Sequence, residues 1–132
     1  MFRTLRVEDN VGVRPLIKAE LQAEFPSIDV IEASDGRKAF VHIDSSTPDL
    51  IFMDIGLPGE NGLQLTRKIK NKYPDIMIVI LTSHDSEYYR ESAIQCRADH
   101  FLEKSCSIPD DVIPFVRSIL LEKGFNADGS EK

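Results

Sequence analysis

The chain has 132 residues and a mass of 14.9 kDa, enough for one domain that buries roughly two thirds of its unfolded surface without disulfides or metals. Its net charge of −6 argues against a nucleic-acid groove in this segment, because duplex binding needs clustered Lys and Arg. Cys96 and Cys106 lack the spacing of a redox or zinc motif, and no apolar run is long enough to span a membrane. We therefore expect a soluble, cytoplasmic protein with reduced thiols.

Segments typical of strands and helices alternate along the chain. We expect strands near residues 2–7, 28–33, 49–54, 76–82 and 99–103, and helices near 11–25, 36–45, 61–73, 85–96 and 109–122. Leu50–Met53 and Ile76–Leu81 are unbroken apolar runs, as is usual in strands covered on both faces. This alternation predicts a doubly wound α/β fold, in which a parallel sheet carries helices on both faces.

Turn residues support these boundaries. Ser34–Gly36 opens the second helix, Asn61 is placed to cap the third, and Pro74 lies just past the end of the third. Pro15 fits only in the first turn of its helix. Pro114 predicts a kink or a delayed start in the last helix.

Polar residues stand where the predicted strands end. The first strand ends in Glu8-Asp9, the third in Asp54 and the fourth in Thr82, and the fifth runs into Lys104. In a doubly wound sheet these carboxyl ends share one edge, where ligands bind. We expect the side chains to lie together at a solvent-exposed rim.

Three acids so close together need cations, because each pair repels by roughly 3–4 kcal/mol at an effective dielectric near 20. Lys104 supplies one cation, and Mg²⁺, which prefers carboxylate and carbonyl oxygens, supplies the other. Gly56 lets a backbone carbonyl approach the metal. In such a site Asp54 is suited to attack phosphorus and form an aspartyl phosphate, while Thr82 donates a hydrogen bond to a phosphoryl oxygen.

At this point the chain resembles a response regulator receiver domain of two-component signalling, over residues 2 to about 122. The resemblance is carried by VEDN at 7–10, EASDG at 32–36, LIFMDIGLPGENGLQL at 50–65, ILTS at 80–83 and ADHFLEK at 98–104. It implies a flavodoxin-like (βα)5 fold with strand order 2-1-3-4-5. It also implies a receiver domain over residues 1–123, followed by a polar tail or the start of a linker over 124–132.

The resemblance assigns a role to seven residues. They are Asp54 as the phospho-acceptor, Glu8 and Asp9 as the acidic pair at the metal, Gly56 as a carbonyl ligand of Mg²⁺, Thr82 as the switch hydroxyl, Lys104 as the lysine that contacts the phosphoryl group, and Phe101 as the rotating switch aromatic. We expect Mg²⁺ to bind weakly, with Glu8 acting through water.

The implied function is a switch that takes a phosphoryl group from a sensor histidine kinase and has no catalysis beyond self-phosphorylation and slow self-dephosphorylation. Its output is a change in the surface formed by the fourth helix, fifth strand and fifth helix, which carries Tyr88, Tyr89 and Arg117. Aromatics and arginine are enriched in protein contacts, so this surface is expected to control an output domain beyond residue 132 or a homodimer. We expect no direct contact with nucleic acid or membrane.

Four positions depart from the family pattern. Arg6 stands where an apolar residue is usual, Arg97 where glycine is usual, and Ser105 where proline is common. An arginine in a central strand needs a partner there. Phe101, in place of tyrosine, is able to rotate but has no hydroxyl to reach a partner.

Other functions remain open on the residues alone. A phosphohydrolase with the same chemistry commonly has a second acid two residues after the nucleophile, where this chain has Gly56. A flavin or nucleotide module needs a phosphate-binding loop after the first strand, where this chain has Glu8-Asp9. A receiver-like interaction module that works without phosphorylation is the remaining alternative.

Overall fold

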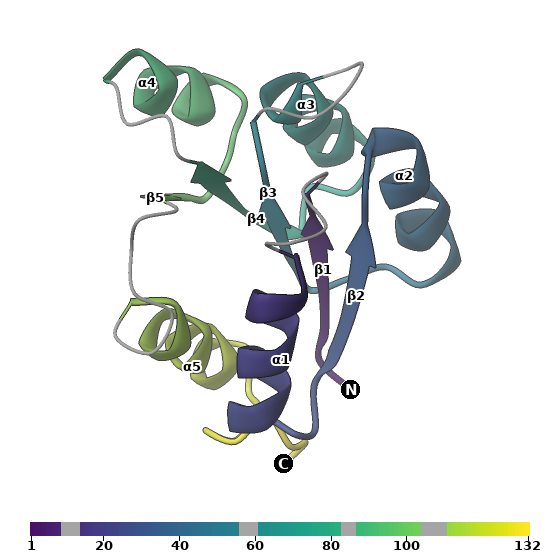
Figure 1. The fold of residues 1–132 in the computed structure, drawn as a ribbon, viewed down its shortest axis with the longest axis vertical. Helices are drawn as coiled ribbons and strands as arrows, with labels where there is room; N and C mark the ends of the chain where they lie inside the picture. Colours follow the sequence, from purple (N-terminus) through teal and green to yellow (C-terminus); the bar gives the residue numbers. More distant parts are fainter. Residues whose placement is uncertain (9–13, 56–60, 83–86, 104–110) are drawn as a thin grey trace.

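The computed structural model describes residues 1–8, 14–55, 61–82, 87–103 and 111–132. Strands and helices alternate throughout these residues (Figure 1). The strands are β1 (Arg3–Val7), β2 (Asp29–Ala33), β3 (Leu50–Met53), β4 (Met77–Thr82) and β5 (His100–Glu103). The helices are α1 (Arg14–Glu24), α2 (Gly36–Ser45), α3 (Gly62–Lys72), α4 (Glu87–Gln95) and α5 (Ile113–Glu122).

The strands form one sheet in the order β2-β1-β3-β4-β5, and every neighbouring pair is parallel. This confirms the predicted doubly wound sheet and its strand order. β1 lies between β2 and β3, so the chain reverses its direction of travel across the sheet after β2. The carboxyl ends of β1 and β3 are adjacent at that switch point, which is where sheets of this class bind ligands.

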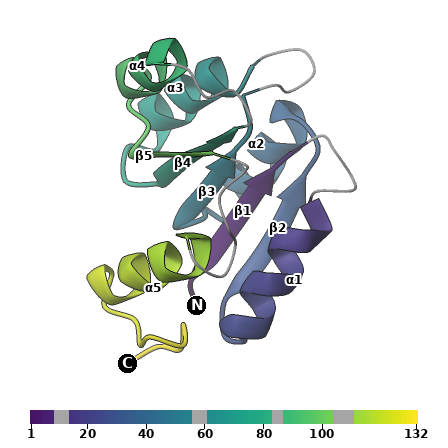
Figure 2. The same cartoon turned by 60° about the vertical axis from the view of Figure 1, so that its left-hand side comes forward.

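Two apolar clusters cover the two faces of the sheet. Figure 2 shows the helices that lie on either side of the strands. Helices α2, α3 and α4 contribute to one cluster, and α1 and α5 contribute to the other. In β3 the side chains alternate between them, with Ile51 and Met53 in the first and Leu50 and Phe52 in the second. Burial on both faces explains why this strand reads as an unbroken apolar run.

The predicted turn chemistry is confirmed at the starts of three helices. The Asp35 side chain caps α2, and Asn61 forms a reciprocal capping box with Gln64 at the start of α3. Pro15 is the second residue of α1, within its first turn. Pro114 is the second residue of α5 and follows π-helical residues 111–112, so the kink or delayed start expected from this proline stays a prediction.

The C-terminal segment folds back after α5. Gly124 has φ of 87°, and the Phe125 N–H donates to the Leu120 carbonyl at 2.8 Å, as in a glycine-terminated helix. The Phe125 ring then packs edge-on against Phe2, with 5.4 Å between ring centroids. The predicted polar tail therefore starts with an apolar contact to the N-terminus, and its role as a linker stays a prediction.

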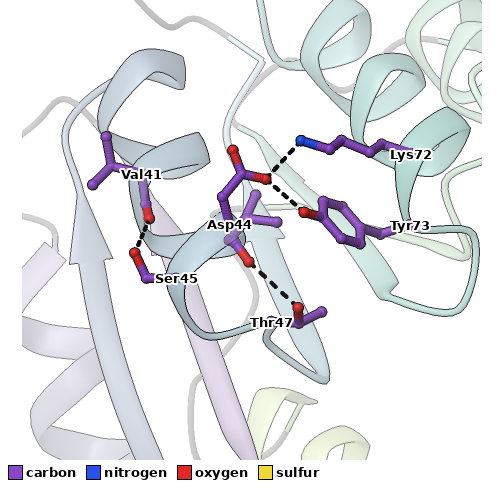
Figure 3. A network of polar contacts seen from close by, with 7 residues as sticks. Val41, Asp44, Ser45, Thr47, Lys72 and Tyr73 are labelled. Atoms are coloured by element: carbon purple, nitrogen blue, oxygen red, sulfur yellow. Dashed lines mark hydrogen bonds and ion pairs between the residues drawn. The ribbon is translucent and has the colours of Figure 1, made fainter.

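A polar network joins the last turns of α2 and α3 (Figure 3). Asp44 accepts hydrogen bonds from the Tyr73 hydroxyl at 2.6 Å and from the Lys72 ammonium at 2.9 Å. The bond to Tyr73 is the main reason that the pKa of Asp44 lies below its usual value and that the pKa of Tyr73 lies above its own. Asp44 and Lys72 are exposed, so their ion pair contributes little to stability.

Arg97 lies in the turn between α4 and β5 with φ of 69°, a left-handed conformation that is unfavourable for residues other than glycine. The Ala98 N–H donates to the Ala93 carbonyl at 2.9 Å across this turn. The Arg97 guanidinium contacts the Asn71 side chain on α3. Arginine in place of glycine therefore introduces backbone strain at this position and gains one exposed polar contact.

Replacing Arg97 with glycine is expected to raise the free energy of unfolding by about 0.5–1 kcal/mol, because relief of the left-handed strain outweighs the lost surface contact. Arg97→Ala is the matched control, since it loses the same contact and keeps the strain. Urea unfolding followed by circular dichroism measures both. Equal stability of the two variants would contradict the strain argument.

Candidate functional site

The acidic site lies at the carboxyl ends of β1 and β3. Glu8 directly follows β1, and Asp54 directly follows β3. The Asp54 N–H donates to the Val7 carbonyl at 3.1 Å, and the Glu8 N–H donates to the Ala33 carbonyl at 3.0 Å. Backbone pairing thus continues one residue past each strand and holds the two acids on adjacent strands.

Both acids are buried, with exposed fractions of 1% for Glu8 and 5% for Asp54. The expectation that they stand at a solvent-exposed rim is therefore wrong for these two side chains. A buried carboxylate needs a charge partner or several hydrogen bonds to stay ionised.

Among the residues that the structure describes, the cation paired with these acids is Arg6, in the interior strand β1 and fully buried. Its guanidinium forms an ion pair with Glu8 at 2.8 Å and donates to the Val7 carbonyl at 3.1 Å. Burial lowers the pKa of Arg6, and the charges of Glu8 and Asp54 oppose that effect. The partner that the sequence required for Arg6 is thus Glu8, which the sequence had assigned to the metal.

Gly62 fixes the site from the other side, although sequence reasoning gave it no role. Its N–H donates to the Ile55 carbonyl at 2.9 Å. A Cβ added to Gly62 would lie 1.9 Å from the Asp54 carbonyl oxygen, closer than any real contact. The start of α3 therefore touches the backbone of Asp54. The sequence feature that could have indicated this contact is a glycine directly after the capping residue Asn61, in the segment that follows Asp54.

The other predicted site residues are described only in part. Thr82 ends β4, paired in register with Glu103 of β5. Phe101 pairs with Ile80 and packs, partly buried, against the apolar cluster that includes α4. Asp9, Gly56 and Lys104 lie outside the described residues, as do Cys106 and Ser105.

Two of the acids at this edge of the sheet are of the kind that binds a divalent cation. Glu8 and Asp54 present carboxylate oxygens, which Mg²⁺ prefers. Within residues 1–8, 14–55, 61–82, 87–103 and 111–132, no group of three or more His, Cys, Asp or Glu side chains is placed to hold a metal. The described carboxylates therefore fit the expected ion, and the roles of Asp9 and Gly56 as further ligands stay predictions.

A pocket of about 510 Å³ lies far from this chemistry. It is lined by residues such as Asp49 and Ile76, which directly precede β3 and β4, and by Lys123. It thus opens at the amino-terminal edge of the sheet, opposite the acids. Among the helices that the structure describes, none is long and apolar enough to cross a membrane.

The sheet order and the paired acids at its switch point define a doubly wound α/β protein with an anionic site at the carboxyl edge. The sequence profile of the response regulator receiver domain matches residues 4–113. The chain belongs to this family, whose members are signalling proteins of two-component systems. The predicted family is confirmed.

Individual relatives agree. The transcriptional regulatory protein DegU of Brevibacillus brevis is 32% identical over 99 residues, covering 74% of this chain and 42% of the relative. The virulence transcriptional regulatory protein PhoP of Salmonella typhimurium is 30% identical over 110 residues, covering 83% of this chain and 48% of the relative. The chain therefore spans about half the length of the curated relatives it matches.

Solved structures show the same fold. The response regulator protein TrrA of Thermotoga maritima, in complex with Mg(2+)-BeF, has a TM-score of 0.79 and 32% identity, covering 91% of this chain and 100% of that one. A CheY-like receiver domain protein of Methanospirillum hungatei has a TM-score of 0.83 at 24% identity, covering 93% and 96%. The latter likeness supports the fold alone.

Proposed function

We propose that this chain is a phospho-accepting switch that receives a phosphoryl group on Asp54 from a sensor histidine kinase in a Mg²⁺-dependent reaction in the cytoplasm. The observation that carries the proposal is the placement of Asp54. It directly follows β3 at the switch point of the sheet, its backbone is held by Val7 and closely approached by Gly62, and a second carboxylate lies on the adjacent strand. The Mg(2+)-BeF complex of the related TrrA supports metal binding in such a site.

In the proposed reaction an Asp54 carboxylate oxygen attacks the phosphorus of a phosphohistidine. A P–O bond forms, the P–N bond breaks, and the departing imidazole nitrogen takes up a proton. Asp9, Asp54 and the Gly56 carbonyl would hold Mg²⁺, with Glu8 nearby, and the bound ion would offset negative charge on the transferring group. Lys104 would contact the phosphoryl group, and Thr82 would donate a hydrogen bond to it.

The proposed output is a change in the surface formed by α4, β5 and α5, with Phe101 turning as Thr82 is drawn toward the phosphoryl group. In the structure, the His100 ring packs edge-on against Phe115 of α5 at 4.7 Å, so β5 and α5 are in direct contact. The Arg117 guanidinium instead contacts Glu24 and lies 5.5 Å from the centre of the Phe25 ring. Arg117 thus binds α1 rather than facing α4 as a free docking group.

The partners proposed for this surface are an output domain and a second copy of the chain. The relatives DegU and PhoP, described as transcriptional regulatory proteins, extend well beyond the matched region, which supports an output domain. A DNA-binding role would belong to that domain, because this segment is acidic.

Incubation with acetyl phosphate and Mg²⁺ is expected to add one phosphoryl group to the wild-type chain and none to Asp54→Asn. The reason is that the amide is a poor nucleophile and makes no aspartyl phosphate. Intact-mass spectrometry followed by peptide mapping measures the label, and Asp75→Asn, an exposed acid away from the site, is the matched control. A label that survives Asp54→Asn would exclude Asp54, and an unlabelled wild type would favour the phosphorylation-independent interaction module.

Thr82→Ala is expected to accept the phosphoryl group on Asp54 but to lose phosphorylation-dependent association. A shift from 1:99 to 99:1 between two states needs about 5.5 kcal/mol, which two or three charge-assisted hydrogen bonds supply. Sedimentation with beryllofluoride as a stable phosphoryl mimic measures association, and Asp54→Asn provides the unresponsive baseline. Equal association of Thr82→Ala and wild type would refute the coupling and leave the acceptor assignment intact.

A further inference from the structure

Arg6 is the largest fully buried side chain in the described part of the protein. It lies in the interior strand β1, where its guanidinium contacts Glu8 at 2.8 Å and the Val7 carbonyl at 3.1 Å. A charge buried this deeply is stable only with a partner of opposite charge and further hydrogen bonds. The fold therefore depends on the contact between Arg6 and Glu8.

The strand register places more negative charge around Arg6. Glu32 of β2 is its register partner on one side, and Phe52 of β3 is its partner on the other. Asp54 is two residues beyond Phe52, so it lies on the same face of the sheet. The carboxylates of Glu8, Asp54 and Glu32 all act electrostatically on the guanidinium. One permanent cation thus already lies within the acidic site.

We propose that Arg6 is an internal counter-cation of the phospho-acceptor site. Its guanidinium pairs with Glu8, so Glu8 does not act as a magnesium ligand through a water molecule. The proposal rests on the proposed function in that Asp54 and Mg²⁺ share this site. Arg6 acts as a positioning residue, since it orients Glu8 and sets the local charge without touching the transferred group.

The consequence is a weakened affinity for divalent cations. Mg²⁺ at Asp54 meets a fixed positive charge on the same face of the sheet, and Glu8 is already neutralised by that charge. Repulsion between a divalent ion and a guanidinium that share this site is expected to correspond to at least about tenfold in affinity. Removal of the Arg6 charge therefore tightens Mg²⁺ binding and makes stability depend on Mg²⁺.

Calorimetric titration of unphosphorylated protein with MgCl2 tests the proposal. Arg6→Met is expected to bind Mg²⁺ at least about tenfold more tightly than wild type. Its urea midpoint is expected to rise more with added Mg²⁺ than that of wild type, because Glu8 then has no guanidinium to neutralise it. Arg6→Lys keeps the charge and is expected to stay within about threefold of wild type. Arg6→Met with wild-type affinity would overturn the proposal.

The double variant Arg6→Met/Glu8→Gln keeps the test decisive if Arg6→Met does not fold. It removes both charges of the pair, so its Mg²⁺ affinity is expected to stay within about threefold of wild type. If Glu8 were instead a magnesium ligand and Arg6 a bystander, the double variant would bind as weakly as Glu8→Gln, at least about tenfold below wild type. These titrations need no phosphorylation, so loss of labelling at Asp54 would overturn the proposed function separately.

Discussion

Replacing Gly62 with alanine is expected to lower the free energy of unfolding by about 3 kcal/mol, at the upper end of the usual cost of overpacking. The new Cβ would meet the Asp54 carbonyl oxygen at 1.9 Å and the carbonyl carbon at 2.7 Å. Both are backbone atoms, so no side-chain rotation relieves the clash, and α3 must move away from the end of β3. Urea unfolding followed by circular dichroism measures the loss.

The same substitution is expected to slow phosphorylation of Asp54 by about a hundredfold, because a displacement of about 1 Å costs that much in a positioned reaction. Gly36→Ala is the matched control, since Gly36 is also the first residue of a helix. Its added Cβ would lie 3.2 Å from the end of the flexible Leu65 side chain. This control is expected to stay within about 1 kcal/mol of wild type. Equal behaviour of the two variants would show that the clash with Asp54 is not limiting.

Removing the carboxylate of Asp99 is expected to cost about 2–3 kcal/mol of unfolding free energy. This acid precedes β5 and accepts hydrogen bonds from the Lys70 ammonium at 2.7 Å and from the Ile78 N–H at 2.8 Å. The Lys70 side chain is only 8% exposed, so Asp99→Ala leaves a buried ammonium whose remaining contact is the Pro74 carbonyl at 3.4 Å. The loss therefore combines an uncompensated charge with an unsatisfied backbone donor.

Lys70→Met is the matched control, because it removes the charge and keeps the bond between Asp99 and Ile78. It is expected to cost no more than about 1 kcal/mol, since the Asp99 carboxylate is 34% exposed and keeps the hydrogen bond from the Ile78 N–H, so no buried charge is left without a partner. In the Lys70→Met background, Asp99→Ala is expected to cost about 1–2 kcal/mol less than in wild type. Denaturant unfolding of the four proteins completes the cycle. Additive losses would show that the ion pair between α3 and the β5 edge carries no coupling.

The sequence by itself determined the fold, because each of its signals is local. The apolar runs in β3 and β4 reflect burial on both faces, and the capping residues Asp35 and Asn61 act on backbone groups only a few positions away. The two prolines near helix starts also act within one turn. Repetition of these local patterns leaves few sheet topologies, and the motif around Asp54 then indicated the family, while the role of Asp54 as the acceptor stays a prediction.

Only the tertiary structure decided how the site is charged and how closely it is packed. The pairing of Arg6 with Glu8 depends on the depth at which β1 is buried, and the influence of Glu32 and Asp54 depends on the register of three strands. The contact of Gly62 with Asp54 is set by where α3 begins against the sheet. Such distances between separate elements follow from packing and leave no periodic signal in the sequence, so Arg6 was recognisable there only as a residue that needs a partner.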